Sequence, residues 1–373
     1  MKNITKYLSG DYIRNYVAIT CFCFLALPVN GQKLSDTLLL KNYNPKSVFN
    51  VPVSTITKAK YKVIDIHSHD YNKTDAEIQE WIKNMDACGI EKTYILNCSW
   101  IGNPFTEYVK EYAPYKDRFG FLCSFDYTNF DKPDWEKRAV EALVRCHEMG
   151  AVGVGEMGDK GMGDLYGTPT EGKGIHVDNP RLKVLFDKCA ELGMFVDIHI
   201  AEPIWMYEPV NEENDGLING ENWKVDTTRA GCLGYNQLMK TFEKALAENP
   251  KTTFVAAHYL NMSHDLPRLS ALLDKYPNMY VDLCGRIAES ASTPRATRAF
   301  IIKYADRILF GTDNGITQEM YHNYFRVLES NDEHFYLPEI GYHWYYSGFN
   351  LPDKVLKKIY YQNAAKILKA VRK

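Results

Sequence analysis

Residues 63–70 read VIDIHSHD, an apolar run that ends in two histidines one residue apart. In a β-strand, side chains two positions apart point to the same side. His67 and His69 are therefore expected to aim two imidazoles at one point, and Asp65 to share the inward side of His67. The stretch predicts a strand that delivers metal-capable side chains at its carboxyl end. The meaning of this feature depends on where the other strands of the chain end.

The whole chain has the composition of a globular protein. It has 373 residues, of which 45% are hydrophobic and 24% charged, with a net charge of −3. The length suits one large domain or two small ones. A slightly acidic chain offers no basic surface for nucleic acid or an anionic membrane. We therefore expect a small-molecule substrate and no nucleic-acid partner, while assembly into a homo-oligomer stays open.

The N-terminal segment, residues 1–31, has the pattern of a signal peptide. Three basic residues precede the apolar stretch YVAITCFCFLALPV, residues 16–29. That stretch is too short to span a bilayer and has the length of a signal's apolar region. We expect cleavage before Gln32 and export, in a bacterium to the periplasm, with no stable membrane association after processing. An uncleaved N-terminal anchor is the alternative.

The cysteines do not form a recognisable disulfide framework. Seven remain beyond the predicted signal peptide, an odd number at irregular spacing. Several lie in apolar strand or helix patterns, including Cys98, Cys189 and Cys284. Buried free thiols are therefore expected.

From residue 61 to the end, strand and helix patterns alternate, after a polar and irregular extension over 32–60. Short runs rich in β-branched residues predict eight strands, at 62–67, 92–98, 119–125, 151–156, 194–200, 252–258, 279–284 and 307–313. Helical periodicity lies between them, at 75–88, 105–115, 134–149, 179–192, 235–249, 265–276 and 294–304, and a closing helix is expected at 351–371. Eight regular units favour an α/β fold of the (β/α)8 TIM-barrel type over a doubly wound open sheet.

Two long loops are expected beyond the bare barrel, at 202–234 after the fifth strand and 321–350 after the eighth. Loops of this length in a compact domain are usually functional, and these would lie at the carboxyl face, where barrel active sites are built. Both are rich in aromatic residues. We expect Trp205 or Trp344 to line a substrate pocket, although these rings could instead pack the loops against the barrel or a neighbouring subunit.

Five of the predicted strands end in side chains that can bind a metal ion. They are His67 and His69 on the first strand, Glu156 on the fourth, His199 on the fifth, His258 on the sixth and Asp313 on the eighth. Each residue alone has an ordinary interpretation, such as a core histidine or a turn-forming aspartate. A barrel, however, brings all these ends to one mouth, and imidazole and carboxylate suit Zn²⁺ and its first-row neighbours.

The ordered segments DIHSH, DIHIAEP, FVAAH and ILFGTD resemble the amidohydrolase superfamily, and most closely its amidohydrolase-related (family 2) branch. The resemblance runs from about Tyr61 to Leu368 and includes the closing YYQNAAKIL. It implies a metal-dependent (β/α)8 hydrolase. His67 and His69 then match the first-strand ligands. The other matches are the fifth-strand ligand His199, the sixth-strand histidine His258 and the eighth-strand aspartate Asp313.

The fourth strand is where branches of the superfamily differ. Glu156 resembles the bridging glutamate of the TatD-type nucleases, whereas single-metal family 2 members commonly lack a bridging group and use the sixth-strand histidine in catalysis. Lys160 lies beyond the strand end, so a carbamylated lysine is not expected. The resemblance therefore leaves open one Zn²⁺ ion or two, and we favour two.

The expected reaction is attack by a metal-activated water on a C–O or C–N bond of a lactone, ester or amide. Asp313 would be both ligand and general base, and His258, where it is not a ligand, would polarise the scissile group. The alternative is a non-oxidative decarboxylase, since the family 2 branch contains such enzymes. That reaction needs a clamp for a carboxylate, for which Arg286 is a candidate, unless Arg286 pairs with Glu289 on the surface. A barrel that only binds its ligand is disfavoured, because the ligand set is intact. Cleavage of DNA is a weaker idea, because an acidic chain offers no phosphate funnel.

Overall fold

The computed structural model of the protein describes residues 33–72, 74–97 and 104–372. The chain divides into two units, Met1–Asn42 and Tyr43–Lys373. The described part of the first unit contains two 3-10 turns, η1 (Leu34–Asp36) and η2 (Leu40–Asn42). The predicted signal peptide, residues 1–31, lies outside the described residues, and the predicted extension over 32–60 is divided between the two units.

The second unit is built on eight parallel strands that neighbour one another in chain order. They are β1 (Val63–Ser68), β2 (Ile90–Leu96), β3 (Phe119–Cys123), β4 (Ala151–Asp159), β5 (Phe195–Ile200), β6 (Phe254–Ala256), β7 (Met279–Asp282) and β8 (Ile308–Leu309). The last strand returns to the first, because the Ile66 N–H donates to the Phe310 carbonyl over 3.0 Å. The predicted (β/α)8 barrel is confirmed.

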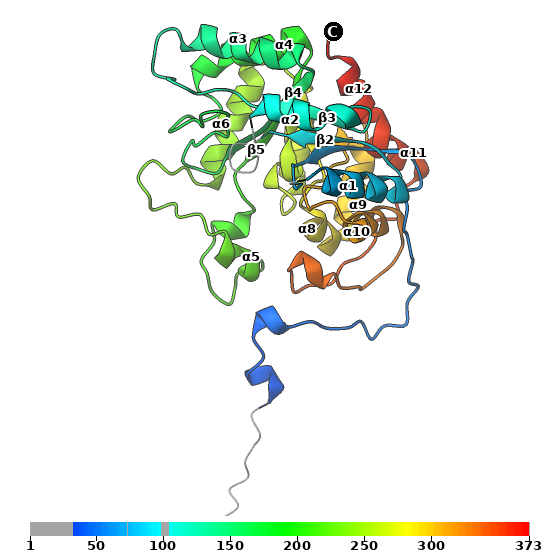
Figure 1. Cartoon of the computed structure of the whole chain (residues 1–373). Coiled ribbons are helices and arrows are strands. Elements are labelled where there is room, and N and C mark those ends of the chain that lie inside the picture. The colour runs from blue at the N-terminus through cyan, green and yellow to red at the C-terminus, as the bar shows by residue number, and fades with distance from the viewer. Residues whose placement is uncertain (1–32, 73, 98–103, 373) are drawn as a thin grey trace, which may run out of the picture. The chain divides into compact units, whose positions relative to one another are not determined.

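Helices follow the strands and surround them, as Figure 1 shows for α1, α3, α4, α6 and α12. The set comprises α1 (Asp75–Cys88), α2 (Phe105–Glu111), η3 (Ala113–Tyr115), α3 (Trp135–Glu148), η4 (Pro180–Leu182), α4 (Lys183–Leu192), α6 (Tyr235–Glu248), α7 (Leu266–Lys275), α8 (Ile287–Ser292), α9 (Pro294–Lys303) and α10 (Gln318–Glu329). The closing helix runs through α11 (Asp353–Lys357), η8 (Lys358–Gln362) and α12 (Asn363–Lys369). Over the part of the chain that the structure covers, no helix is both long and apolar enough to cross a lipid bilayer.

Helix ends follow the signals in the sequence. The Thr74 side chain accepts a hydrogen bond from the Glu77 N–H and so caps the start of α1. Gly89 ends the same helix at φ 84°, a left-handed conformation in which an L side chain is strained. Together these two residues define where α1 begins and ends.

Apolar side chains fill the barrel in two layers. The inner cluster takes residues from seven strands and from the closing helix: Ile64, Ile66, Tyr94, Leu96, Leu122, Phe195, Val255, Tyr280, Leu309, Ala364 and Ile367. The larger outer cluster lies between the strands and the surrounding helices. Because α12 contributes to the inner cluster, we infer that it closes one end of the barrel, and the opposite, carboxyl end is left for chemistry.

The first strand departs from strict alternation. Ile64 and Ile66 belong to the inner cluster, so Asp65 lies on the other face, and the expectation that it points inward with His67 is wrong. The Asp65 carboxylate instead accepts hydrogen bonds from the Thr312 hydroxyl over 2.7 Å and from the Thr312 N–H over 3.2 Å. The pairing of β1 with β2 is irregular between Asp65 and Ser68, and this irregularity returns His67 to the interior.

The two expected loops differ in their structure. Between β5 and α6 the chain carries only the short helices η5 (Ile204–Met206) and α5 (Leu217–Asn222). After β8, the expectation of a loop over 321–350 is wrong in its first part, because α10 continues to Glu329. Its buried side chains recur every three or four residues, as in Tyr321, Tyr324, Phe325 and Leu328, so the aromatic residues there form the face of a barrel helix.

The six cysteines that the structure describes are all free thiols, and Cys189 and Cys284 are buried as predicted. Cys98 lies outside the described residues.

Candidate metal centre

The six metal-capable side chains predicted from the strand ends come together at the carboxyl end of the barrel. The four histidines and Glu156 are buried, and the Asp313 side chain is 23% exposed. Two triplets each offer ligand atoms within 4.8 Å of one another, namely His67, His69 and Glu156, and Glu156, His199 and His258. Glu156 is common to both triplets, so the cluster has two halves that meet at one carboxylate.

The two oxygens of Glu156 face different halves of the cluster. Its Oε1 lies 2.7 Å from His199 Nδ1 and 3.5 Å from His258 Nε2. Its Oε2 lies 3.5 Å from His69 Nε2. Asp313 closes the opposite side, with Oδ1 3.2 Å from His69 Nε2 and Oδ2 3.7 Å from His258 Nε2. This arrangement allows each carboxylate to contact both halves.

Hydrogen bonds at the outer nitrogens set the direction of two imidazoles. His67 Nδ1 lies 3.0 Å from Asp282 Oδ2, and His258 Nδ1 lies 2.9 Å from the Cys284 carbonyl oxygen. Each ring therefore keeps its Nε2 as the inner atom. The buried Nε2 of His67 finds no hydrogen-bond partner among the described residues. Buried polar atoms are normally satisfied, and a metal ion is the group that an inward-facing, outward-anchored imidazole suits.

The charges of the cluster follow from burial and neighbours. Burial favours neutral His67, but the Asp197 and Asp282 carboxylates outweigh it and raise the pKa of His67 to about 10. Burial and the nearby Arg286 lower the pKa of His258, which keeps that imidazole neutral. Burial acts against ionised Asp313, yet the surrounding histidines hold its pKa below the usual range. Anionic Asp313 beside the neutral imidazole of His258 is a donor pair that fits a divalent metal, whereas His67 must first release its second proton before its Nε2 can bind one.

Sequence reasoning missed Asp197 and Asp282, which lie behind His67. Both are fully buried, and Asp197 Oδ1 lies 3.6 Å from His67 Nδ1. The signal was present in the alternation of β5, where Asp197 and His199 share one face. Asp282 also accepts hydrogen bonds from the His258 N–H over 2.8 Å and from the Cys284 thiol over 2.7 Å. One carboxylate thus supports two histidines of the cluster.

His258 begins a left-handed turn. From His258 to Asn261 the φ angles are 61°, 53°, 54° and 50°. Each such residue costs roughly 1–2 kcal/mol relative to right-handed backbone. Two side chains compensate, since Asp282 accepts from the His258 N–H and the Asn261 amide donates to the Ala201 carbonyl over 2.9 Å. Strained backbone held in this way is typical of functional sites.

Arg286 pairs with Glu289, as the alternative expected, but the pair lies beside the cluster and not on the surface, since the Arg286 side chain is 14% exposed and that of Glu289 3%. Its Nε donates to Asn261 Oδ1 over 2.8 Å and its Nη1 to the Gly285 carbonyl over 2.9 Å. Two carboxylates, Glu202 and Glu289, each approach the guanidinium to 3.8 Å. Glu202 was also missed, and it lies with one oxygen 3.5 Å from His199 Nε2.

Trp205 and Trp344 belong to loops that meet near Arg286. The Trp205 ring centroid lies 6.1 Å from that of Tyr342 and 6.3 Å from that of Trp344, and Tyr342 stacks on Trp344 at 4.2 Å. The Tyr342 hydroxyl donates to Glu289 over 2.7 Å. The loops after β5 and α10 are thus joined by aromatic contacts, whereas a role of these rings in substrate binding stays a prediction.

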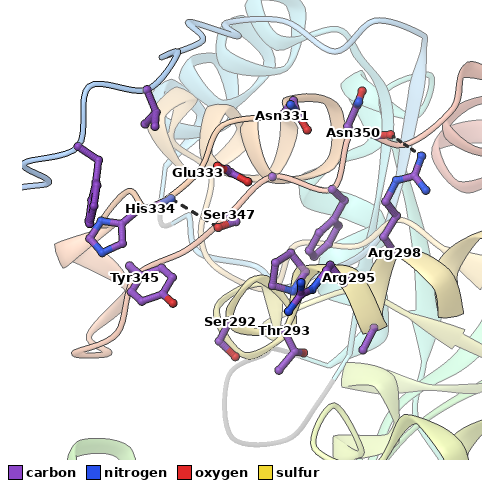
Figure 2. Close-up of a pocket in the computed structure, with 16 residues that line it drawn as sticks. Ser292, Thr293, Arg295, Arg298, Asn331, Glu333, His334, Tyr345, Ser347 and Asn350 are labelled. Atoms are coloured by element: carbon purple, nitrogen blue, oxygen red, sulfur yellow. Dashed lines mark hydrogen bonds between the residues drawn. The ribbon is translucent and has the colours of Figure 1, made fainter.

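Two cavities flank this region. The larger, about 940 Å³, lies at the junction of α8 and α9 and under the chain from 331 to 350 (Figure 2). Arg295, Arg298 and Tyr345 line it, and the six metal-capable residues are absent from its described lining. A second cavity of about 440 Å³ has Glu202 in its wall and therefore adjoins the cluster.

Comparison with known proteins gives a family and a fold. The model of a protein family described as Amidohydrolase matches residues 100–370, a range that begins after His67 and His69. No curated protein matches the chain by sequence.

Solved structures match over most of the chain. An uncharacterized TIM-barrel protein from Bordetella bronchiseptica is 18% identical, with a TM-score of 0.53 over 83% of this chain and 99% of that one. A dihydroxybenzoic acid decarboxylase from Polaromonas sp. JS666, with bound manganese and 2-nitroresorcinol, is 15% identical, with a TM-score of 0.52 over 84% of this chain and 98% of that one. The 5-carboxyvanillate decarboxylase of Sphingomonas paucimobilis is 12% identical, with a TM-score of 0.50 over 83% and 99%. At these identities the likeness concerns the fold.

Proposed function

This chain belongs to the amidohydrolase family, and from that premise we propose that it is a metal-dependent hydrolase of a C–O or C–N bond in a small molecule, such as a lactone, ester or amide. The observation that carries the choice of hydrolysis is the environment of Arg286. This arginine is the buried cation beside the cluster that a decarboxylase would use to hold a substrate carboxylate. Here Glu202 and Glu289 already approach it to 3.8 Å, so a further carboxylate would meet two like charges.

The proposed ligands are His67, His69, Glu156, His199 and Asp313, with zinc as the metal. When bound, such a metal supplies Lewis-acid activation of water and of the scissile carbonyl. Asp313 is the partly exposed member of the set, and its low pKa keeps the carboxylate ionised, so that it can accept a hydrogen bond from the attacking water and act as its general base. The Nε2 of neutral His258 lies between the Glu156 and Asp313 carboxylates and so faces the centre of the cluster.

We propose that the cluster holds two ions rather than one. The supporting observation is that Glu156 directs Oε1 to His199 and His258 and Oε2 to His69, as a bridging carboxylate would. We propose that His258 joins His199 on the second ion. A crystal structure at full metal loading tests this. A single ion with Glu156 turned away from it would contradict the two-ion proposal.

A non-oxidative decarboxylase is the second candidate. It is favoured by the likeness to the decarboxylases from Polaromonas and Sphingomonas, one of which contains manganese. The two candidates differ in product, because decarboxylation releases CO₂ and hydrolysis does not.

The test combines metal analysis with a substrate screen. Metal per chain would be measured in the wild type and in the His67→Ala and His69→Ala variants, with Lys303→Ala as a surface control. The metal-loaded protein would then be offered lactones, esters and amides, and separately hydroxybenzoic acids with detection of CO₂. We expect metal to be lost in the two histidine variants and turnover to appear among the first group. Equal metal in all preparations, or CO₂ release alone, would refute the proposal.

We also propose that the chain is exported after cleavage near residue 31, on the basis of its basic and then apolar N-terminal sequence. N-terminal sequencing of protein from its native host decides this, and an intact Met1 in a cytoplasmic fraction would rule it out.

A further inference from the structure

The cavity of about 440 Å³ beside the metal-capable cluster is made by two segments at the carboxyl face of the barrel. One is the chain at and after the end of β4, with Lys160 and Tyr166 in the wall, and the other is the insertion after β5, with Trp223 and Arg229. Its volume falls within the range of about 300–1,000 Å³ typical of small-molecule sites. It lies at the end of the barrel where barrel enzymes bind their substrates.

A continuous line of contacts joins this cavity to the cluster. Glu202, in the cavity wall, places Oε2 3.5 Å from His199 Nε2 and forms an ion pair with Lys160 through Oε1. The Lys160 ammonium in turn lies 5.8 Å from the centroid of the Trp223 ring. A ligand beside Trp223 would therefore be separated from His199 by one ion pair.

The lining of the cavity suits an uncharged ligand with many hydrogen-bonding groups. Three cationic side chains, Lys160, Lys224 and Arg229, are matched by three carboxylates, Asp164, Glu202 and Asp226, so the wall has no net formal charge. Such a wall offers donors and acceptors in equal supply. A pocket for an aromatic acid would instead be mainly apolar, with only a few polar groups.

Trp223 gives the cavity a flat apolar surface. Its side chain is 62% exposed, although a large apolar ring is usually withdrawn from water. An exposed indole surrounded by polar groups is suited to stacking against a ring that has one apolar face and a polar perimeter. A saturated ring with hydroxyl groups around its edge has this character.

We propose that this cavity binds a neutral, polyhydroxylated ring of the carbohydrate class, stacked on Trp223, so that a group attached to the ring is directed past Glu202 toward the metal-capable cluster. The orientation toward the cluster rests on the proposed hydrolase function, whereas the binding of the ring does not.

Binding is tested without reference to turnover. A panel of methyl glycosides of common hexoses and pentoses would be added at millimolar concentration to the full-length, metal-loaded protein, with benzoate as the anionic comparison. Saturation-transfer NMR would detect binding and calorimetry would give its Kd. We expect at least one glycoside to bind. Trp223→Ala should weaken it by about tenfold, the equivalent of one stacking contact, and Trp223→Phe should restore most of the affinity.

The control is Tyr43→Ala, which removes a comparably exposed ring outside the cavity and should leave the Kd unchanged. If Trp223→Ala does not fold, Arg229→Ala should also weaken binding by removing a donor from the wall. The inference would be overturned if benzoate bound in place of the glycosides or if no glycoside bound. It would also be overturned if Trp223→Ala and Arg229→Ala bound the glycoside as tightly as the wild type. None of those results bears on the hydrolase proposal. Conversely, glycoside binding together with no turnover in the screen of lactones, esters and amides would overturn only the hydrolase proposal.

Discussion

Replacing Asp282 with asparagine should disable His67 as a ligand while preserving the volume of the side chain. In the wild type, Asp282 Oδ1 accepts from the His258 N–H and from the N–H and thiol of Cys284, and Oδ2 faces His67 Nδ1. An asparagine has one acceptor oxygen, and the larger number of donors at the Oδ1 position will hold it there. The amide NH₂ then faces His67 Nδ1.

The expected consequence is a change of tautomer. With a donor opposite Nδ1, the His67 ring keeps its proton on Nε2, the atom that faces the cluster. The variant loses a hydrogen bond to a charged group, about 1.5–3 kcal/mol, which corresponds to a decrease in metal affinity of about 10- to 100-fold.

A competition titration against a chelator of known affinity measures this change, with thermal unfolding to confirm that the variant is folded. Asp274→Asn is the matched control, since that carboxylate is exposed and pairs with Lys303 on the surface. A metal affinity within twofold of wild type in Asp282→Asn would show that Asp282 does not set the orientation or tautomer of His67.

Three further predictions concern the surroundings of the cluster. Gly311→Ala should lower metal content, because an added Cβ would lie 2.8 Å from the Cβ of His67, whereas Gly234→Ala, with only one neighbour at 3.8 Å, should match wild type in elemental analysis. Once a substrate is known, Trp205→Ala and Trp344→Ala should each raise KM, by about tenfold for a lost aromatic contact, with metal content intact; wild-type kinetics in both variants would show that these loops are structural. Removal of the metal with a chelator should abolish turnover and lower the Tm, and re-addition of Zn²⁺ should restore both, because a ligand bound to the native state stabilises it.

The barrel and the six residues of the cluster could be predicted because both follow from local patterns. Alternating strand and helix signals determine the order of the elements. A parallel barrel then places every strand's carboxyl end at one mouth, so His199 and His258 meet although their strands are separate in sequence. This inference needs no knowledge of side-chain packing.

The features that escaped prediction depend on irregular backbone or on distant contacts. The prediction that Asp65 points inward is wrong because the pairing of β1 with β2 is irregular between Asp65 and Ser68. A sequence pattern read as strict alternation cannot reveal such an irregularity. Arg286 is enclosed by contacts with Glu202 and Asn261, which follow β5 and β6 and so lie far from it in the sequence. The loop expected from residue 321 begins only after Glu329, because the buried aromatic positions of α10 recur at helical spacing, which an aromatic-rich segment does not by itself reveal.

Anomalous diffraction can show whether the strand-end histidines and carboxylates hold a metal. Crystals of the zinc-loaded protein would be measured on both sides of the zinc absorption edge. We expect an anomalous peak about 2.0–2.2 Å from His67 Nε2 and His69 Nε2 and in contact with Glu156, with a second peak against His199 and His258. Fully loaded crystals with no peak within bonding distance of these residues would contradict it.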